Sequence, residues 1–394
     1  MIIMRNRLDR TTFTKLSILS LIQFLRLSGV FFVIPVLALY ATKFTSSGFL
    51  IGMSLAAYEI SMAIMQIPSG KLSDRYGRVR IIRAGLLIFM IGNLLSWQST
   101  SIYELIGSRF IAGLGAVSSP ITALSQEIVP EDRKNTAMAI IGSGIGAAFL
   151  LGTAFSPLLG YAIHIRNIFL ISSVMALVGL IAVGYVRDSH VPRPHSGYSI
   201  KRSTILLSLG SLTFSIASFI IVYAIQIYAG ISFGILEYGI VLLIPVIFSG
   251  MVALYLSEVY GRRRHMNFVR ISAVTITLGI AVVFAGIFFS FPFPIITLFL
   301  IPFYIGFSLY EISTIPALTS SLRRESYGSN IGFFYALQFV GNGIGASLGG
   351  YIGGTGLGSS STLILGVIGV GVSIAGSFIF LLSQAVLDPV ESPA

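Results

Sequence analysis

Long apolar runs alternate along this chain with short polar segments. An apolar run of roughly 20 residues is long enough to cross a bilayer as a helix. The pattern predicts twelve such helices, six in each half of the chain. Their expected ranges are 16–40, 49–68, 81–97, 102–125, 136–163, 168–186, 205–228, 236–256, 268–289, 295–317, 331–352 and 363–382.

A basic, glycine-containing segment at 70–80 separates the second run from the third and predicts a tight turn at the membrane surface. A copy follows 184 positions later, where 256–262 matches 72–78 at five of seven positions. The longest internal polar interruption lies between the sixth and seventh runs. We therefore predict an all-α membrane protein of two pseudo-symmetric six-helix bundles, 1–187 and 203–394, joined by a cytoplasmic linker at 188–202.

The composition supports this class, because 55% of the residues are hydrophobic and only 10% are charged. A net charge of +11 could suggest a nucleic-acid partner, but 21 of the 25 Lys and Arg residues fall in segments on one predicted side of the membrane and two on the other. This asymmetry predicts a multi-pass protein of the cell membrane with both termini in the cytoplasm, and no nucleic-acid partner.

The inventory of reactive groups is sparse. There is no cysteine, the four histidines lack the spacing of a metal site, and no phosphate-binding glycine loop or Ser/His/Asp pattern is present. We expect no metal, no cofactor and no enzymatic activity.

The fifth and eleventh runs are rich in glycine. In the eleventh, Gly341, Gly345 and Gly349 recur every four residues, so they share one helix face and predict close helix contact. These glycines could serve static packing of the helices or a contact that moves.

Three motifs resemble those of the major facilitator superfamily. The segment at 70–80 matches its motif A completely, at Gly70, Leu72, Asp74, Arg75, Gly77, Arg78 and Arg80. The fourth run carries a second signature, Arg109, Gly113 and Gly115. A third, associated with antiporters, is matched only in part: Gly152, Pro157 and Gly160 are kept, but Ser156 and Tyr161 replace glycines.

Two stretches, 24–40 and 309–350, look like the YajR-type branch of drug:proton antiporters. Some members of that branch carry an additional soluble carboxy-terminal domain. The tail after the last run is short, so we expect no such domain here.

The resemblance implies a conformational switch formed by Gly70, Asp74, Arg75, Gly77, Arg78 and Glu127. Asp74 would lie at the amino terminus of the eleventh helix, where the helix dipole favours an acid, and Arg78 would pair with Glu127. Such links would join the two halves on the inside and favour the state open to the outside. The alternative is that Asp74 and Arg78 only cap helices.

Four ionisable residues fall inside predicted spans, where a charge is costly unless it is paired or faces water. They are Arg26, Glu59, Arg109 and Glu311. Arg26 and Glu59 lie at similar depth and could form an ion pair, either functional or purely structural. We favour Glu311 as the proton carrier, with Glu59 second. The resemblance implicates Arg109 in proton coupling, although anchoring its helix near the headgroups is an alternative.

Polar side chains in the remaining apolar runs are candidates for substrate binding. They are Gln23, Tyr223, Gln226, Tyr310, Tyr335, Gln338 and Asn342. Equally, they could form hydrogen bonds between helices.

Together these features predict a proton-coupled secondary transporter that works by alternating access, an exporter of small amphipathic compounds or drugs. Its partners would be a small-molecule substrate, protons and the bilayer, and we expect a monomer. An uptake symporter and a non-transporting sensor or scaffold are the alternatives.

Overall fold

The computed structural model describes residues 9–130, 133–186, 200–260, 265–320, 322 and 327–387, and all regular structure in these ranges is helical. The elements are α1 (Arg10–Ala41), α2 (Gly48–Tyr76), α3 (Arg78–Gln98), α4 (Ile102–Leu114), α5 (Ser118–Glu127), α6 (Lys134–Ile163), α7 (Ile165–Ala182), the short 3₁₀ helix η3 (Val183–Tyr185), α8 (Arg202–Ser232), α9 (Ile235–Tyr260), α10 (His265–Phe288), α11 (Phe293–Ser320), α12 (Tyr327–Gly353) and α13 (Ser359–Leu387). The predicted all-α class is confirmed for this part of the chain.

Within the described residues, 11 helices are long and apolar enough to cross a membrane. The fourth predicted span is interrupted, because α4 ends at Leu114 and α5 begins at Ser118. Pro120 has no N–H to continue the helical hydrogen bonds through this region, and Gly115 precedes the break. Both pieces pack along α2 and α3, so together they take the place of the fourth predicted span.

The predicted turn at 70–80 is shorter than expected. α2 continues to Tyr76 and α3 begins at Arg78, so only Gly77 separates the two helices. Gly77 has φ of 100°, a conformation that other residues rarely adopt. Most of the motif is therefore the last part of α2. The side chains of its second copy from Ser257 onward lie outside the description.

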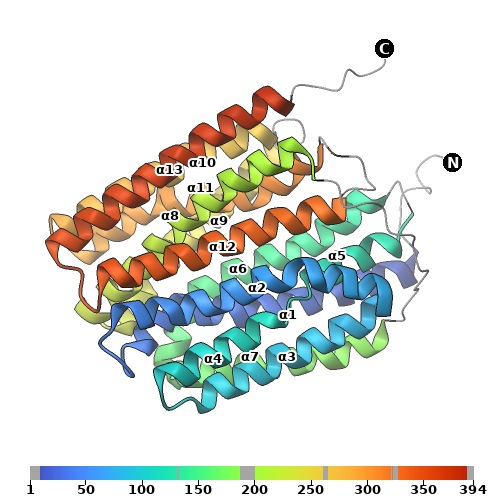
Figure 1. Cartoon of the computed structure of the whole chain (residues 1–394), viewed down its shortest axis with the longest axis horizontal. Helices are drawn as coiled ribbons and strands as arrows, with labels where there is room; N and C mark the ends of the chain where they lie inside the picture. The colour runs from blue at the N-terminus through green and yellow to red at the C-terminus, as the bar shows by residue number, and fades with distance from the viewer. Residues whose placement is uncertain are drawn as a thin grey trace.

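The helices before the segment 187–199 are called the first set (α1–α7) and those after it the second set (α8–α13), and the two sets meet most extensively along three pairs of neighbours. These pairs are α2 with α12, α6 with α9, and α1 with α8. Figure 1 shows α12 running beside α2. The linker predicted at 188–202 lies outside the described residues up to 199, and α8 begins at Arg202.

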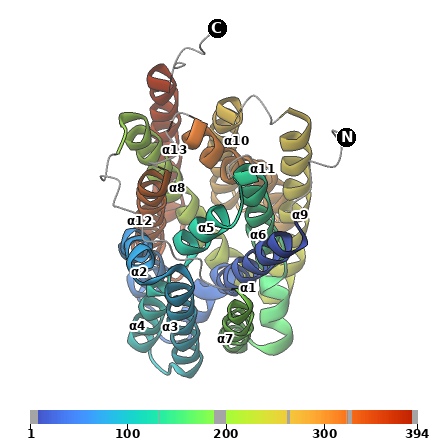
Figure 2. The ribbon, with the colours of Figure 1, turned by 90° about the vertical axis from the view of Figure 1, so that its right-hand side faces the viewer.

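The start of α1 and the end of α13 lie at the same end of the bundle (Figure 1). This end, which also carries Gly77, is called the basic end, and the opposite end, with the connections at 42–47 and 354–358, the far end. Figure 2 views the molecule from the basic end.

At the far end the two sets are in backbone contact. Gly48 and Gly52 of α2 pack so tightly on Gly350 of α12 that a Cβ on Gly350 would collide with the Gly48 carbonyl oxygen. Nearby, the Ala38 N–H of α1 donates to Oε1 of Gln226 in α8 at 2.9 Å. These contacts close the seam between the sets at this end.

Candidate functional site

Tyr58 of α2 lies between two buried arginines. Arg26 of α1 is fully buried, and its Nη2 donates to the Tyr58 hydroxyl at 3.3 Å. Arg109 of α4, only 1% exposed, lies 4.6 Å from the centre of the Tyr58 ring and donates to Asn93 at 3.4 Å. A guanidinium over an aromatic face is stabilised by the ring quadrupole, more strongly where water is excluded.

The predicted ion pair between Arg26 and Glu59 is wrong. Arg26 donates instead to Tyr58, to the Ser118 hydroxyl at 3.2 Å and to the Met62 sulfur at 3.0 Å. Tyr58 and Glu59 are consecutive on α2, so their side chains point in different directions around the helix. Tyr58 faces the first set, and Glu59 faces α12.

Anchoring of Arg109 near the headgroups is also wrong, because its guanidinium is enclosed by the aromatic rings of Tyr58 and Phe169. Its proton-coupling role stays a prediction.

Glu59 joins the two sets in the middle of the bundle. Its side chain is 3% exposed and accepts a hydrogen bond of 2.9 Å from Nδ2 of Asn342 on α12. A hydrogen bond to a carboxylate is stronger when the group is ionised, so the strength of this contact between α2 and α12 depends on the protonation of Glu59.

Glu311 of α11 is exposed and accepts a hydrogen bond of 2.8 Å from Nε2 of Gln338. One turn earlier on the same face, the Phe307 ring stacks on Phe149 of α6 at 5.1 Å, so this face is directed toward the first set. The exposed carboxyl of Glu311 therefore lies on the face between the sets, toward the basic end.

The opposing face of α6 is open in the same region. Gly142 and Gly146 precede Phe149 by two turns and one turn, and neither would bring an added Cβ within 4 Å of another group. This contrasts with the closed seam at the far end.

α12 supplies the donor to both carboxyl groups. Gln338 and Asn342 are four residues apart, about one helical turn, and so share a face of α12. One amide reaches Glu311 of the second set and the other reaches Glu59 of the first.

The candidate substrate residues fall into two groups. Tyr223, Gln226 and Tyr310 are buried, and each uses a polar atom in a hydrogen bond to another segment. Gln23 is also buried and donates to Ser118 at 3.1 Å. Gln23, Gln226 and Tyr310 make the interhelical hydrogen bonds that formed the alternative interpretation, whereas Tyr223 donates to Gly354, directly after α12.

The other three candidates lie on α12 near the carboxylates. The Tyr335 ring stacks with Phe339 at 6.1 Å, while Gln338 and Asn342 hold Glu311 and Glu59. Substrate binding by any of the seven residues stays a prediction.

In the switch motif, Arg78 lies between two acids. It forms an ion pair with Glu127 of α5 at 2.9 Å, as the resemblance implied, and a second ion pair, which was not expected, with Asp74 one turn earlier. Arg78 also donates to the Ser73 hydroxyl, while the Arg75 guanidinium lies 5.2 Å from the Tyr76 ring. Gly70 accepts from Arg78 through its carbonyl oxygen at 3.5 Å.

Both partners in the Arg78–Glu127 pair belong to the first set, so this contact does not itself join the two halves, contrary to the expectation. The pairing of Asp74 with the start of the eleventh span falls next to residues 323–326, which lie outside the description. That pairing, and the switch role, stay predictions.

Sequence reasoning missed Tyr58, Asn93 and Ser118, the partners of the two buried arginines. Asn93 carries a signal, because it is an amide within the apolar run at 81–97. No feature of the sequence singles out Tyr58 or Ser118, because tyrosine and serine are common throughout these spans.

Comparison with protein families decides the class. The profile described as Major Facilitator Superfamily matches residues 19–346, well over half of the chain. The chain belongs to the major facilitator superfamily. It is thus a multi-pass membrane protein of a transporter family.

The curated relatives of this major facilitator protein include named transporters. The inner membrane transport protein YajR of Escherichia coli is 28% identical over 385 residues, which cover 94% of this chain and 81% of that protein. An uncharacterized transporter of Buchnera aphidicola is 29% identical over 84% of this chain and 86% of its own. Multidrug resistance protein 2 of Bacillus subtilis is 27% identical over 41% of each chain. The resemblance to the superfamily near YajR is confirmed.

Solved structures confirm the major facilitator fold. A bacterial homolog of the human lysosomal transporter Spinster, in an inward-facing conformation, aligns with a TM-score of 0.73 at 17% identity, over 98% of this chain and 100% of its own. The human organic anion transporter MFSD10 aligns with a TM-score of 0.69 at 15% identity, over 97% of this chain and 100% of its own.

Proposed function

We propose that this chain is a proton-coupled antiporter that exports small amphipathic compounds by alternating access. The observation that carries the proposal is the pair of carboxyl groups held by consecutive turns of α12, Glu311 through Gln338 and Glu59 through Asn342. Ionisable groups at this depth are costly, so their presence argues for a role in moving charge.

The two carboxyl groups have different surroundings, which supports different roles. Glu311 is exposed on the face between the sets and can exchange a proton with water from the basic end. Glu59 is buried at the seam with α12, and its protonation weakens a bond that joins the sets. Proton uptake at Glu311 and weakening of the Glu59–Asn342 hydrogen bond between the sets are thus the two steps that this antiporter would couple.

The surroundings of Glu311 favour an amphipathic substrate. The stacked rings of Phe149 and Phe307 lie one turn away, and the stacked rings of Tyr335 and Phe339 lie on α12 beside Gln338. Apolar walls with a few polar groups are typical of sites for amphipathic ligands. The multidrug resistance names among the relatives support the same substrate class.

The experiment is proton transport in liposomes. The purified protein is reconstituted with a pH-sensitive dye inside, a proton gradient is imposed, and ethidium or a rhodamine is added as an amphipathic cation. We expect the compound to dissipate the gradient, Glu311→Gln to abolish this dissipation, and Glu237→Gln to retain it. Glu237 is the matched control because it is an exposed carboxylate at the start of α9.

Full dissipation in Glu311→Gln would remove Glu311 from the mechanism. Protons that move in the same direction as the compound would replace antiport by symport, an alternative that Ser156 and Tyr161 in the antiporter motif keep open.

We also propose a monomer in the cell membrane with both termini in the cytoplasm, so that the basic end faces inward. The charge asymmetry supports this orientation, and the starts and ends of the described helices agree on which segments share a side. Because the chain has no cysteine, a single Ser46→Cys variant tests it: a membrane-impermeant thiol reagent should label intact cells from outside. Labelling that occurs only after the cells are lysed would show that the basic end faces outward instead.

A further inference from the structure

The hydrogen-bond partners of α1 change at Pro35. Before the proline, the side-chain hydrogen bonds that join α1 to other helices within the described residues all go to the first set. The Ser172 hydroxyl of α7 donates to the Gly29 carbonyl oxygen at 2.8 Å. The Ser156 hydroxyl of α6 donates to the Phe32 carbonyl oxygen at 2.6 Å. The other α1 residues that bond to the first set in this way are Ser20, Gln23 and Arg26.

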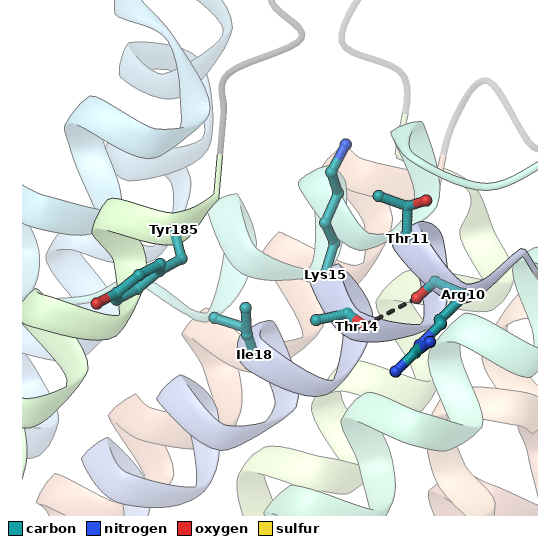
Figure 3. Close-up of a pocket in the computed structure, with 6 residues that line it drawn as sticks. All are labelled: Arg10, Thr11, Thr14, Lys15, Ile18 and Tyr185. Carbon is teal, nitrogen blue, oxygen red and sulfur yellow. Dashed lines mark hydrogen bonds between the residues drawn. The ribbon is translucent and has the colours of Figure 1, made fainter.

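The start of α1 also lies against the first set. A recess lies there at the basic end, and Figure 3 shows it between the first turns of α1 and Tyr185 of η3. It is lined by Arg10, Thr11, Thr14, Lys15, Ile18 and Tyr185, which all belong to the first set. These contacts tie α1 to the first set from its start to Phe32.

From the proline onward, the partners come from the second set. The Tyr238 hydroxyl of α9 donates to the Pro35 carbonyl oxygen at 3.1 Å. The Ala38 N–H donates to Oε1 of Gln226 in α8 at 2.9 Å. All four residues are buried. Two helices of the second set therefore reach the same turn of α1.

The proline explains why backbone groups of a helix are available to side chains at this turn. An N–H in a regular α-helix is directed at the carbonyl oxygen four residues earlier. Pro35 has no N–H, and its ring clashes with the Phe31 carbonyl oxygen, which opens the helical hydrogen bonds around it. A side chain inserted between such bonds, as Gln226 is at Ala38, accompanies a bend of this kind.

We propose that Tyr238 and Gln226 form a latch on the proline turn of α1, which holds the far end closed. The tip of α1 also contacts the first set, since the Tyr40 ring lies 5.7 Å from the ring of Phe169 in α7. Opening of the far end therefore has to break both hydrogen bonds of the latch. The inference rests on the alternating access of the proposed function, but neither on proton coupling nor on the direction of transport.

Ser156 holds the opposite side of the latch. This serine stands where the antiporter motif has a glycine, and its hydroxyl binds the Phe32 carbonyl oxygen three residues before the proline. The bonds to the first set end just before Pro35, and those to the second set begin there. Separation of the two sets therefore loads the bonds of Tyr238 and Gln226 and leaves that of Ser156 intact.

The test counts open and closed molecules of the purified full chain by the distance between spin labels at Ser46→Cys and Ser360→Cys, which are exposed at the far end on different sets. Tyr238→Phe removes one hydroxyl and keeps the ring. A hydrogen bond between membrane helices changes such a ratio about threefold, so we expect the ratio of open to closed molecules to rise by about threefold. In Pro35→Ala a regular helix withdraws the backbone groups, and Tyr238→Phe should then have little further effect.

The matched control is Ser156→Ala, which removes a hydroxyl bound to the same stretch of α1 from within the first set. It should leave the ratio at the wild-type value. An unchanged ratio in Tyr238→Phe, or an equal rise in Ser156→Ala, would overturn the latch. A full threefold effect of Tyr238→Phe in the Pro35→Ala background would overturn its assignment to the proline turn. One short distance in the wild type and in every variant, at any pH, would refute alternating access together with the latch, whereas a second distance that no variant alters refutes the latch alone.

Discussion

The hydrogen bond between Glu59 and Asn342 gives the sharpest test of how protonation could control the two helix sets. It joins α2 to α12 in the middle of the bundle at 2.9 Å, in a structure whose far end is closed. Replacing Asn342 by alanine removes the donor and leaves Glu59 buried. The state in which the far end opens should then be more populated than in the wild type.

The size of the shift depends on the charge of Glu59. A hydrogen bond to an ionised group contributes about 1.5–3 kcal/mol, which corresponds to a roughly 10- to 150-fold change in the ratio of open to closed molecules. A neutral bond between membrane helices contributes only about 0.6 kcal/mol, or roughly threefold. We therefore expect the effect of Asn342→Ala to exceed tenfold at high pH and to fall toward threefold as the pH is lowered and Glu59 takes up a proton.

Distance measurements between two spin labels can follow this ratio. Ser46 and Ser360 are exposed at the far end on different helix sets, and the absence of cysteine allows both to be changed to cysteine without background labelling. Gln338→Ala is the matched control, because Gln338 is an amide one turn away on α12 whose partner Glu311 belongs to its own set.

Two results would refute this reasoning. One is an unchanged distance distribution in Asn342→Ala at any pH, and the other is an equal shift in Gln338→Ala. A double variant with Glu59→Ala should add little to Asn342→Ala alone, because both changes remove the same bond.

Three further predictions concern packing, the buried arginine and the switch. Gly345→Ala should lower the free energy of unfolding by about 1–3 kcal/mol because its Cβ meets the Ile216 carbonyl carbon at 3.0 Å, whereas Gly356→Ala, in open space, should not; equal denaturation curves would contradict this. Arg109→Lys should lower the free energy of unfolding by about 0.5–2 kcal/mol, because the planar stack on Tyr58 is lost. Unaltered thermal unfolding would show that this cation–π contact does not stabilise the fold. Asp74→Asn should insert into the membrane at wild-type levels but lose transport in liposomes, and full activity there would reduce Asp74 to a helix cap.

The number and position of the spans could be predicted from the sequence, because the requirement for a long apolar helix is local. The break at 115–117 could not, although Gly115 and Pro120 mark a weak point, since neither residue by itself decides between a kink and a complete interruption.

The partners of the buried charges could not be predicted, because depth along a helix says nothing about direction around it. Arg26 and Glu59 have similar depth, yet one faces Tyr58 and the other faces a helix nearly 300 positions later in the chain. The glycines of α12 illustrate the same limit. Gly345 packs on α8 of its own set, as the four-residue spacing suggested, while Gly350 uses a different face to meet α2 of the other set.

The interruption of the fourth span has a mechanical consequence. Arg109 lies on α4, whereas Ser118 and Glu127, the partners of Arg26 and Arg78, lie on α5. A continuous helix would transmit every tilt at the basic end to the arginine stacked on Tyr58. With two separate pieces, α5 can follow the surface turn at Gly77 while α4 stays fixed in the interior, so that rearrangement at the basic end need not disturb the buried arginines around Tyr58.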